Sequence, residues 1–191
     1  MLADEYMNRE EPWAAVGIHG KASALKLLYD PYSEIVIAQV GQDSPSGHFL
    51  KHVYTRLRTE NQYHLFTPES RLLSYEDVVL SPKGFCLFAN VFELVDENDQ
   101  NTMFNWHGLQ ALELPSGKVL FELNSKNLEP QPGHRDPGLM NIVSVAGDGK
   151  SIVARLAATE QGKTKMGNWL VNLNLDERRY ELITELSCTF L

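Results

Sequence analysis

One arrangement recurs three times along this 191-residue chain and limits what it can fold into. In each copy an apolar segment leads into a four-residue turn and then into a second apolar segment. The three pairs cover residues 25–40, 77–94 and 141–158, with turns at 30–33, 81–84 and 147–150. Proline presets φ and glycine permits positive φ, so their presence in these short stretches marks turns. The pattern predicts three β-hairpins.

A second pair of strands is expected after each hairpin. These later pairs cover residues 49–66, 106–123 and 169–186, and Leu57, Leu114 and Leu175 precede their turns at nearly equal intervals. A nearly constant period indicates a repeated structural unit. We therefore predict an all-β domain over residues 21–191, preceded by an N-terminal segment, residues 1–20. Its three four-stranded antiparallel units would cover about residues 21–70, 71–125 and 138–191.

The spacing of apolar residues supports strands rather than helices. Every second residue is apolar in one segment of the third unit: Trp169, Val171, Leu173 and Leu175. This is the period of a strand with one buried face. Residues 85–92 are almost continuously apolar, as expected for a strand covered on both faces. Residues 22–29 have a helix-favouring composition, but their position in the repeat predicts a strand, because tertiary context overrides propensity.

The turns Ser81-Pro82-Lys83-Gly84 and Gly147-Asp148-Gly149-Lys150 resemble the Ser-Pro-Asp-Gly-Lys turn of WD40-like propeller repeats of the TolB type. The resemblance extends over about residues 20–187 and implies that each unit is one propeller blade. Lys83 stands where the motif has Asp, Ala146-Gly147 replaces Ser-Pro, and no Trp-Asp dipeptide is present. The short turn motif carries the resemblance.

Three blades are fewer than the four to eight of a closed propeller, so two sheet edges would stay open. Four arrangements would resolve this. Two chains could dimerise into a six-bladed ring, or residues 13–18 could add a strand. The chain could also be part of a longer propeller, or the strands could form a β-barrel or a sandwich instead.

Charge and cysteine content limit the partners and the compartment. The formal net charge is −8, with the acidic residues scattered, and a negative protein repels phosphate backbones, so we expect no nucleic-acid partner. The acidic residues 1–11 lack the apolar segment of a secretory signal, and no run approaches the ~18 apolar residues of a membrane span. Cys86 and Cys188 make no disulfide framework. We expect a cytoplasmic protein without a membrane partner.

The longest predicted loop, residues 124–138, is rich in proline and glycine and carries the best candidate cluster, His134, Arg135 and Asp136. Such a trio could bind an anionic ligand or transfer protons, and His107 is a candidate fourth member. The competing interpretation is a solvated polar loop. These four residues are the predicted ligand-binding residues, and no catalytic residue is assigned.

Two other groups of polar residues do not predict a metal site. His48 and His52 would lie about 13 Å apart on a strand, too far to share one ion. Asp96, Glu97 and Asp99 lack the glycine that a calcium loop needs for its turn. Neither a metal nor a cofactor is therefore expected.

The repeated sheets, the open ends and the missing catalytic motif favour a non-catalytic module that binds a protein or peptide through loops and edges. Its partner would be another protein or a second copy of the chain. The alternative is a small-ligand-binding or hydrolytic propeller with a site at a loop rim, and a third possibility is a fragment of a longer propeller.

Overall fold

The computed structural model describes residues 22–43, 49–66, 73–94, 104–163 and 166–186. These residues form three separate antiparallel sheets of four strands each and contain no α-helix. In every sheet the strands follow their order in the chain, so each sheet is a simple meander. The sheets do not join into a closed barrel. The predicted all-β class and the three four-stranded units are therefore confirmed.

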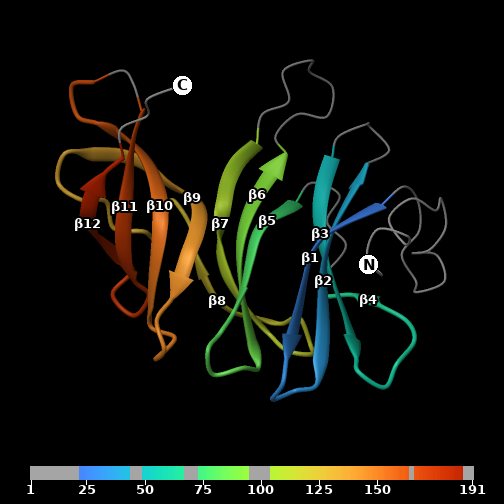
Figure 1. Cartoon of the computed structure of the whole chain (residues 1–191). Helices are drawn as coiled ribbons and strands as arrows, with labels where there is room; N and C mark the ends of the chain where they lie inside the picture. The colour runs from blue at the N-terminus through green and yellow to red at the C-terminus, as the bar shows by residue number, and fades with distance from the viewer. Residues whose placement is uncertain (1–21, 44–48, 67–72, 95–103, 164–165, 187–191) are drawn as a thin grey trace.

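The first sheet consists of β1 (Ala22–Asp30), β2 (Ile35–Asp43), β3 (Phe49–Leu57) and β4 (His64–Leu65). The second consists of β5 (Leu73–Leu80), β6 (Cys86–Leu94), β7 (Phe104–Glu113) and β8 (Val119–Leu123). The third consists of β9 (His134–Val145), β10 (Ser151–Glu160), β11 (Met166–Asn174) and β12 (Arg179–Glu185). The sheets lie side by side in chain order, with the second between the other two (Figure 1).

One apolar cluster fills the space between the first and second sheets, and another fills the space between the second and third. The first cluster includes Ile35, Ile37 and Val53 of the first sheet with Val78 and Leu87 of the second. The second cluster joins residues of both sheets, among them Phe88, Leu109, Leu139, Ile152 and Trp169. Burial of these side chains is the main force that holds the three sheets together.

Strand β6 contributes to both clusters because its sheet is covered on both faces. Leu87, Ala89 and Val91 belong to the cluster shared with the first sheet, whereas Phe88 belongs to the cluster shared with the third. The continuous apolar sequence predicted this double burial. The alternation in β11 is confirmed as well, since Trp169 and Val171 are buried in the second cluster.

Residues 22–29 form part of β1, as the repeat predicted in spite of their helix-favouring composition. Leu28 packs against the cluster between the first two sheets. Leu27 and Tyr29 occupy the alternate positions and are exposed. Tertiary pairing with β2 thus decides the conformation of this segment.

The predicted loop over residues 124–138 is wrong at its C-terminal end, because β9 already begins at His134. Pro137 is accommodated because β9 is an edge strand, where a missing N–H need not break a ladder. Asp136 has a φ of 51°, and the pairing with β10 shifts between Ala157 and Thr159, so the strand passes the proline through a bulge. The third sheet therefore begins four residues before the boundary expected for its unit.

No helix in the described part of the chain is long and apolar enough to cross a membrane.

Candidate functional site

Strand pairing identifies equivalent positions in the three sheets. Leu27 of β1, Val78 of β5 and Ile142 of β9 lie opposite alanines of the next strand: Ala38, Ala89 and Ala154. The residue before each of them is Lys26, Asp77 or Asn141. These three residues pair with Gln39, Asn90 and Arg155 respectively. Every sheet thus carries a polar pair at the same place.

The amides of this polar pair hold neighbouring sheets together. Gln39 Nε2 of the first sheet donates a hydrogen bond to the Tyr75 carbonyl oxygen of β5, at 2.6 Å. Asn90 Nδ2 of the second sheet donates to the Leu139 carbonyl oxygen of β9, at 3.2 Å. Tyr75 and Leu139 are equivalent, because each pairs with the residue that follows the polar residue of the second strand. Val91 follows Asn90, and Leu156 follows Arg155. The same bond therefore recurs at both junctions.

The first strands of the sheets make a second recurring contact. Lys26 Nζ donates to the Val78 carbonyl oxygen at 2.8 Å. At the other junction, the Ile142 N–H donates to Asp77 Oδ2 at 3.0 Å. Burial raises the pKa of Asp77, and it outweighs the Ile142 hydrogen bond and the nearby lysines, which lower it. In both cases, the side chain contacts the backbone of the next sheet at the residue after that sheet's own polar position. Val78 follows Asp77, and Ile142 follows Asn141.

The first sheet has an apolar face that no other sheet of the described chain covers. We call it the β1 face and define it by Leu27 and Tyr29. Leu27 is 60% exposed, whereas the equivalent residues Val78 and Ile142 are 0% and 7% exposed. Tyr29 is 44% exposed, whereas its equivalent Leu80 packs against the cluster between the first two sheets. On the same face, Ala38, Val40 and Tyr54 are buried in a small cluster against which Tyr63 and Leu65 pack, so only the β1 part of the face is exposed. The β1 face thus resembles the part of an inter-sheet surface that β5 and β9 contribute in their sheets.

The opposite end of the structure is the outer face of the third sheet, which carries Asn141 and Arg155 in the polar-pair positions. Arg155 donates to Asn168 Oδ1 of its own sheet, from Nε at 3.3 Å and from Nη2 at 3.1 Å. Val153 stands where the first and second sheets have Ile37 and Phe88. This face keeps the hydrogen-bonding groups of a junction, and Val153 is smaller than the Phe88 of the second sheet.

The sequence-predicted residues His134, Arg135 and Asp136 lie at the start of β9 but do not converge on one site. The His134 ring packs on Trp169 with centroids 4.4 Å apart, and its Nδ1 lies 3.0 Å from the Tyr180 hydroxyl. Arg135 and Asp136 are exposed. The imidazole therefore has a packing role in the third sheet.

His107 lies on β7 of the second sheet, and its Nδ1 is 3.6 Å from Glu93 Oε2 on the neighbouring β6. This contact is within its own sheet. Trp106, the preceding residue, points to the other side, where it packs against the second cluster and donates from Nε1 to Asn90 Oδ1 at 2.9 Å. The four predicted ligand-binding residues are divided between two sheets.

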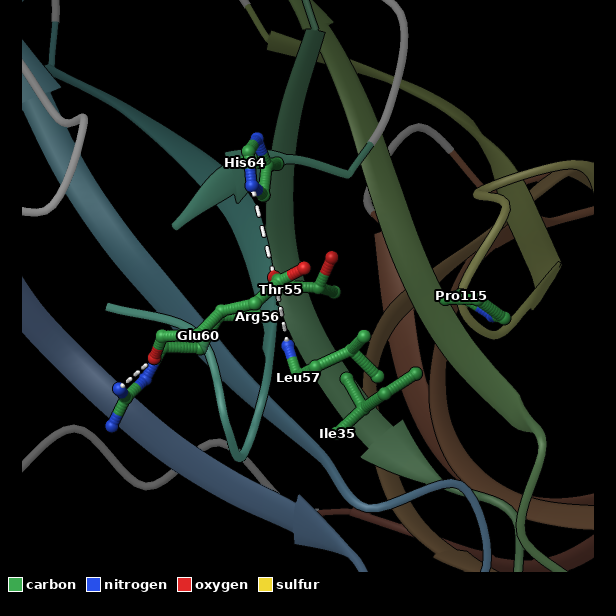
Figure 2. Close-up of a pocket in the computed structure, with 7 residues that line it drawn as sticks. All are labelled: Ile35, Thr55, Arg56, Leu57, Glu60, His64 and Pro115. Atoms are coloured by element: carbon green, nitrogen blue, oxygen red, sulfur yellow. Dashed lines mark hydrogen bonds and ion pairs between the residues drawn. The ribbon is translucent and has the colours of Figure 1, made fainter. Parts of the chain in front are cut away.

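A pocket of about 240 Å³ opens between the first sheet and the turn that joins β7 and β8 (Figure 2). Its lining consists of Ile35, Thr55, Arg56, Leu57, Glu60, His64 and Pro115. Glu60 Oε2 accepts a hydrogen bond from the Leu57 N–H at 3.2 Å and lies 3.8 Å from His64 Nε2. The Arg56 guanidinium lies over the Tyr63 ring, and in Figure 2 it extends away from Pro115.

These contacts close the turn between β3 and β4 and place no nucleophile against a base. The accessible surface of the pocket is mainly apolar, although four of its lining residues are polar or charged. Within the described ranges, no three His, Cys, Asp or Glu side chains are gathered in a way that could hold a metal ion. Residues 13–18, His48, Asp96, Glu97, Asp99 and Cys188 lie outside the described residues.

Sequence reasoning did not identify the polar pairs that join the sheets. One signal was present: Gln39 and Asn90 each interrupt an apolar strand at the same distance from its turn. A scan against protein-family models found no match, and a search of the curated proteins found no significant similarity.

Proposed function

We propose that the protein is a non-catalytic interaction module that binds a protein partner through the β1 face. The observation that carries the proposal is the exposure of Leu27, at 60%, in a position where the other two sheets bury Val78 and Ile142. An exposed side chain in a position built for burial is a reason to look for a missing partner.

The way in which the sheets pack also supports this face. Strands β5 and β9, the first strands of their sheets, carry Val78 and Ile142 into the clusters shared with the preceding sheet. Strand β1 is the first strand of its sheet and has the same polar and apolar pattern. A partner with a flat surface that carries hydrogen-bond donors would complete a third junction of the same kind.

The same proposal includes the protein family and the cellular compartment. The turn motif and the three meander sheets support blades of a WD40-like, TolB-type propeller. The two cysteines without a disulfide framework support a cytoplasmic location.

The test compares what immobilised wild-type and variant chains retain from an extract of the source cells. Leu27→Asp and Tyr29→Asp should each remove the retained partner, because a carboxylate would be buried in the contact. Leu120→Asp is the matched control, since Leu120 is 54% exposed on β8 of another sheet. Equal retention by all the variants, with circular dichroism unchanged, would rule out the β1 face as the binding surface.

A further inference from the structure

We propose that the partner of the β1 face is the third sheet of a second copy of this chain, so that two copies close a ring of six sheets. This inference rests on the proposed function and commits it to one partner. Six sheets lie within the four to eight of a closed propeller. Both contacts of such a dimer would be the same, each joining the third sheet of one copy to the first sheet of the other.

The hydrogen-bonding positions of the third sheet carry the argument. Gln39 and Asn90 reach the carbonyl oxygens of Tyr75 and Leu139 in the next sheet. Arg155 holds the equivalent place in the third sheet, and Ala24 is the residue of the first sheet equivalent to Tyr75. In the ring, Arg155 of one copy donates to the Ala24 carbonyl oxygen of the other.

Asn141 provides the second bond in the same way. Lys26 and Asp77 contact the backbone of Val78 and Ile142 in the next sheet. Asn141 occupies their position, and Leu27 of the other copy occupies the position that receives the contact. An asparagine side chain both donates and accepts, so it can pair with either backbone group of Leu27. The bond would cover Leu27 as Val78 and Ile142 are covered inside the chain.

The opposite pairing, with two β1 faces against each other, buries Leu27 but uses neither Asn141 nor Arg155. That difference is why the third sheet is the proposed occupant. Its outer face has a smaller apolar side chain at one position, since Val153 stands where the second sheet has Phe88. Apolar burial sets most of the strength of such contacts. The dimer should therefore be weak enough to dissociate on dilution.

The first experiment measures the mass of the full chain by light scattering over a range of concentrations. The expected result is a dimer at high concentration that dissociates on dilution. Arg155→Met keeps the aliphatic stem but removes the donors, so it should weaken the dimer at least tenfold. Arg58→Met, on the exposed turn after β3, is the matched control and should leave the dimer unchanged. A monomer at every concentration, or a dimer that Arg155→Met leaves intact, would overturn the ring.

A second experiment identifies the faces in contact by disulfide cross-linking of a mixture of Leu27→Cys and Val153→Cys chains. Val153 is chosen because its equivalent, Ile37, shares a cluster with Val78, the equivalent of Leu27. The ring predicts 27–153 links by peptide mass spectrometry, whereas 27–27 links alone would overturn it. If the chain is a monomer but Leu27→Asp still abolishes retention of another protein, the ring fails and the proposed function stands. If Leu27→Asp changes neither the mass nor the retention, the proposed function fails as well.

Discussion

Replacing Asn90 by alanine tests whether the polar pairs hold the sheets together. Asn90 is fully buried and makes two side-chain hydrogen bonds, one to the Leu139 carbonyl oxygen at 3.2 Å and one from Trp106 Nε1 at 2.9 Å. The first crosses from the second sheet to the third, and the second fixes the indole beside that junction. Asn90→Ala removes both.

The expected loss of stability follows from these two bonds. Each hydrogen bond contributes about 1 kcal/mol net, and a buried donor left without a partner costs about 1–3 kcal/mol. Trp106 is only partly buried, so the lower end of that penalty applies to its N–H. The sum predicts that Asn90→Ala lowers the free energy of unfolding by about 3 kcal/mol. A loss of that size in a chain of this length lowers the melting temperature by roughly 6–12 °C.

The assay is urea unfolding followed by tryptophan fluorescence, with Asn105→Ala as the matched control. Asn105 lies on β7 of the same sheet but is exposed, so its removal should change the stability by less than about 0.5 kcal/mol. A double-mutant cycle with Trp106→Phe, which removes only the N–H donor, should show a coupling of about 1 kcal/mol. A loss below about 1 kcal/mol in Asn90→Ala would refute a stabilising role for the recurring amide bonds.

Three further predictions concern stability. Burial raises the pKa of Asp77, so its contribution to the free energy of unfolding is fully present below pH 3.8 and is lost as pH rises through the folded pKa. Asp77→Asn should therefore be more stable than wild type at pH 7. Urea titrations should show this difference in stability vanishing below pH 3.8. Gly117 has a φ of 71°, and a Cβ there would overlap the carbonyl oxygen of Phe66, the residue after β4, so Gly117→Ala should cost at least about 2 kcal/mol, whereas Gly147→Ala, in open space, should cost little in the same denaturation assay. His134→Ala should lower the unfolding free energy by about 2 kcal/mol through lost aromatic packing, and Arg135→Ala, on an exposed side chain, should give a melting temperature close to wild type; the reverse order would favour the ligand-site interpretation.

The repeated turns made most of the fold predictable from sequence. Pro31, Pro82 and Gly84 mark chain reversals through local conformational preferences, and such signals need no knowledge of tertiary contacts. The position of residues 22–29 in the repeat gave the correct strand where local propensity favoured a helix. The repeat was therefore more informative than the composition of a single segment.

The features that the sequence did not reveal depend on contacts between segments distant in the chain. Pro137 and Gly138 have the composition of a loop, and only the edge position of β9 allows a strand through them. His134 stood out as a functional candidate because histidine in a polar loop is reactive. The aromatic rings that occupy it come from β11 and β12, more than thirty residues later in the chain. Local sequence does not reveal such a neighbour.

The double burial of β6 leaves the register of the middle sheet weakly determined by hydrophobicity. In a strand, a shift of one residue turns every side chain to the opposite face. Such a shift would move Phe88 into the cluster of the first sheet and Leu87 and Ala89 into the cluster of the third. Because both clusters are apolar, the burial of nonpolar surface would change little. Asn90 distinguishes the two registers, because the shifted one would direct its amide into the cluster of the first sheet, away from the Leu139 carbonyl oxygen. A polar residue in the most hydrophobic strand thus determines which neighbour each face of the middle sheet meets.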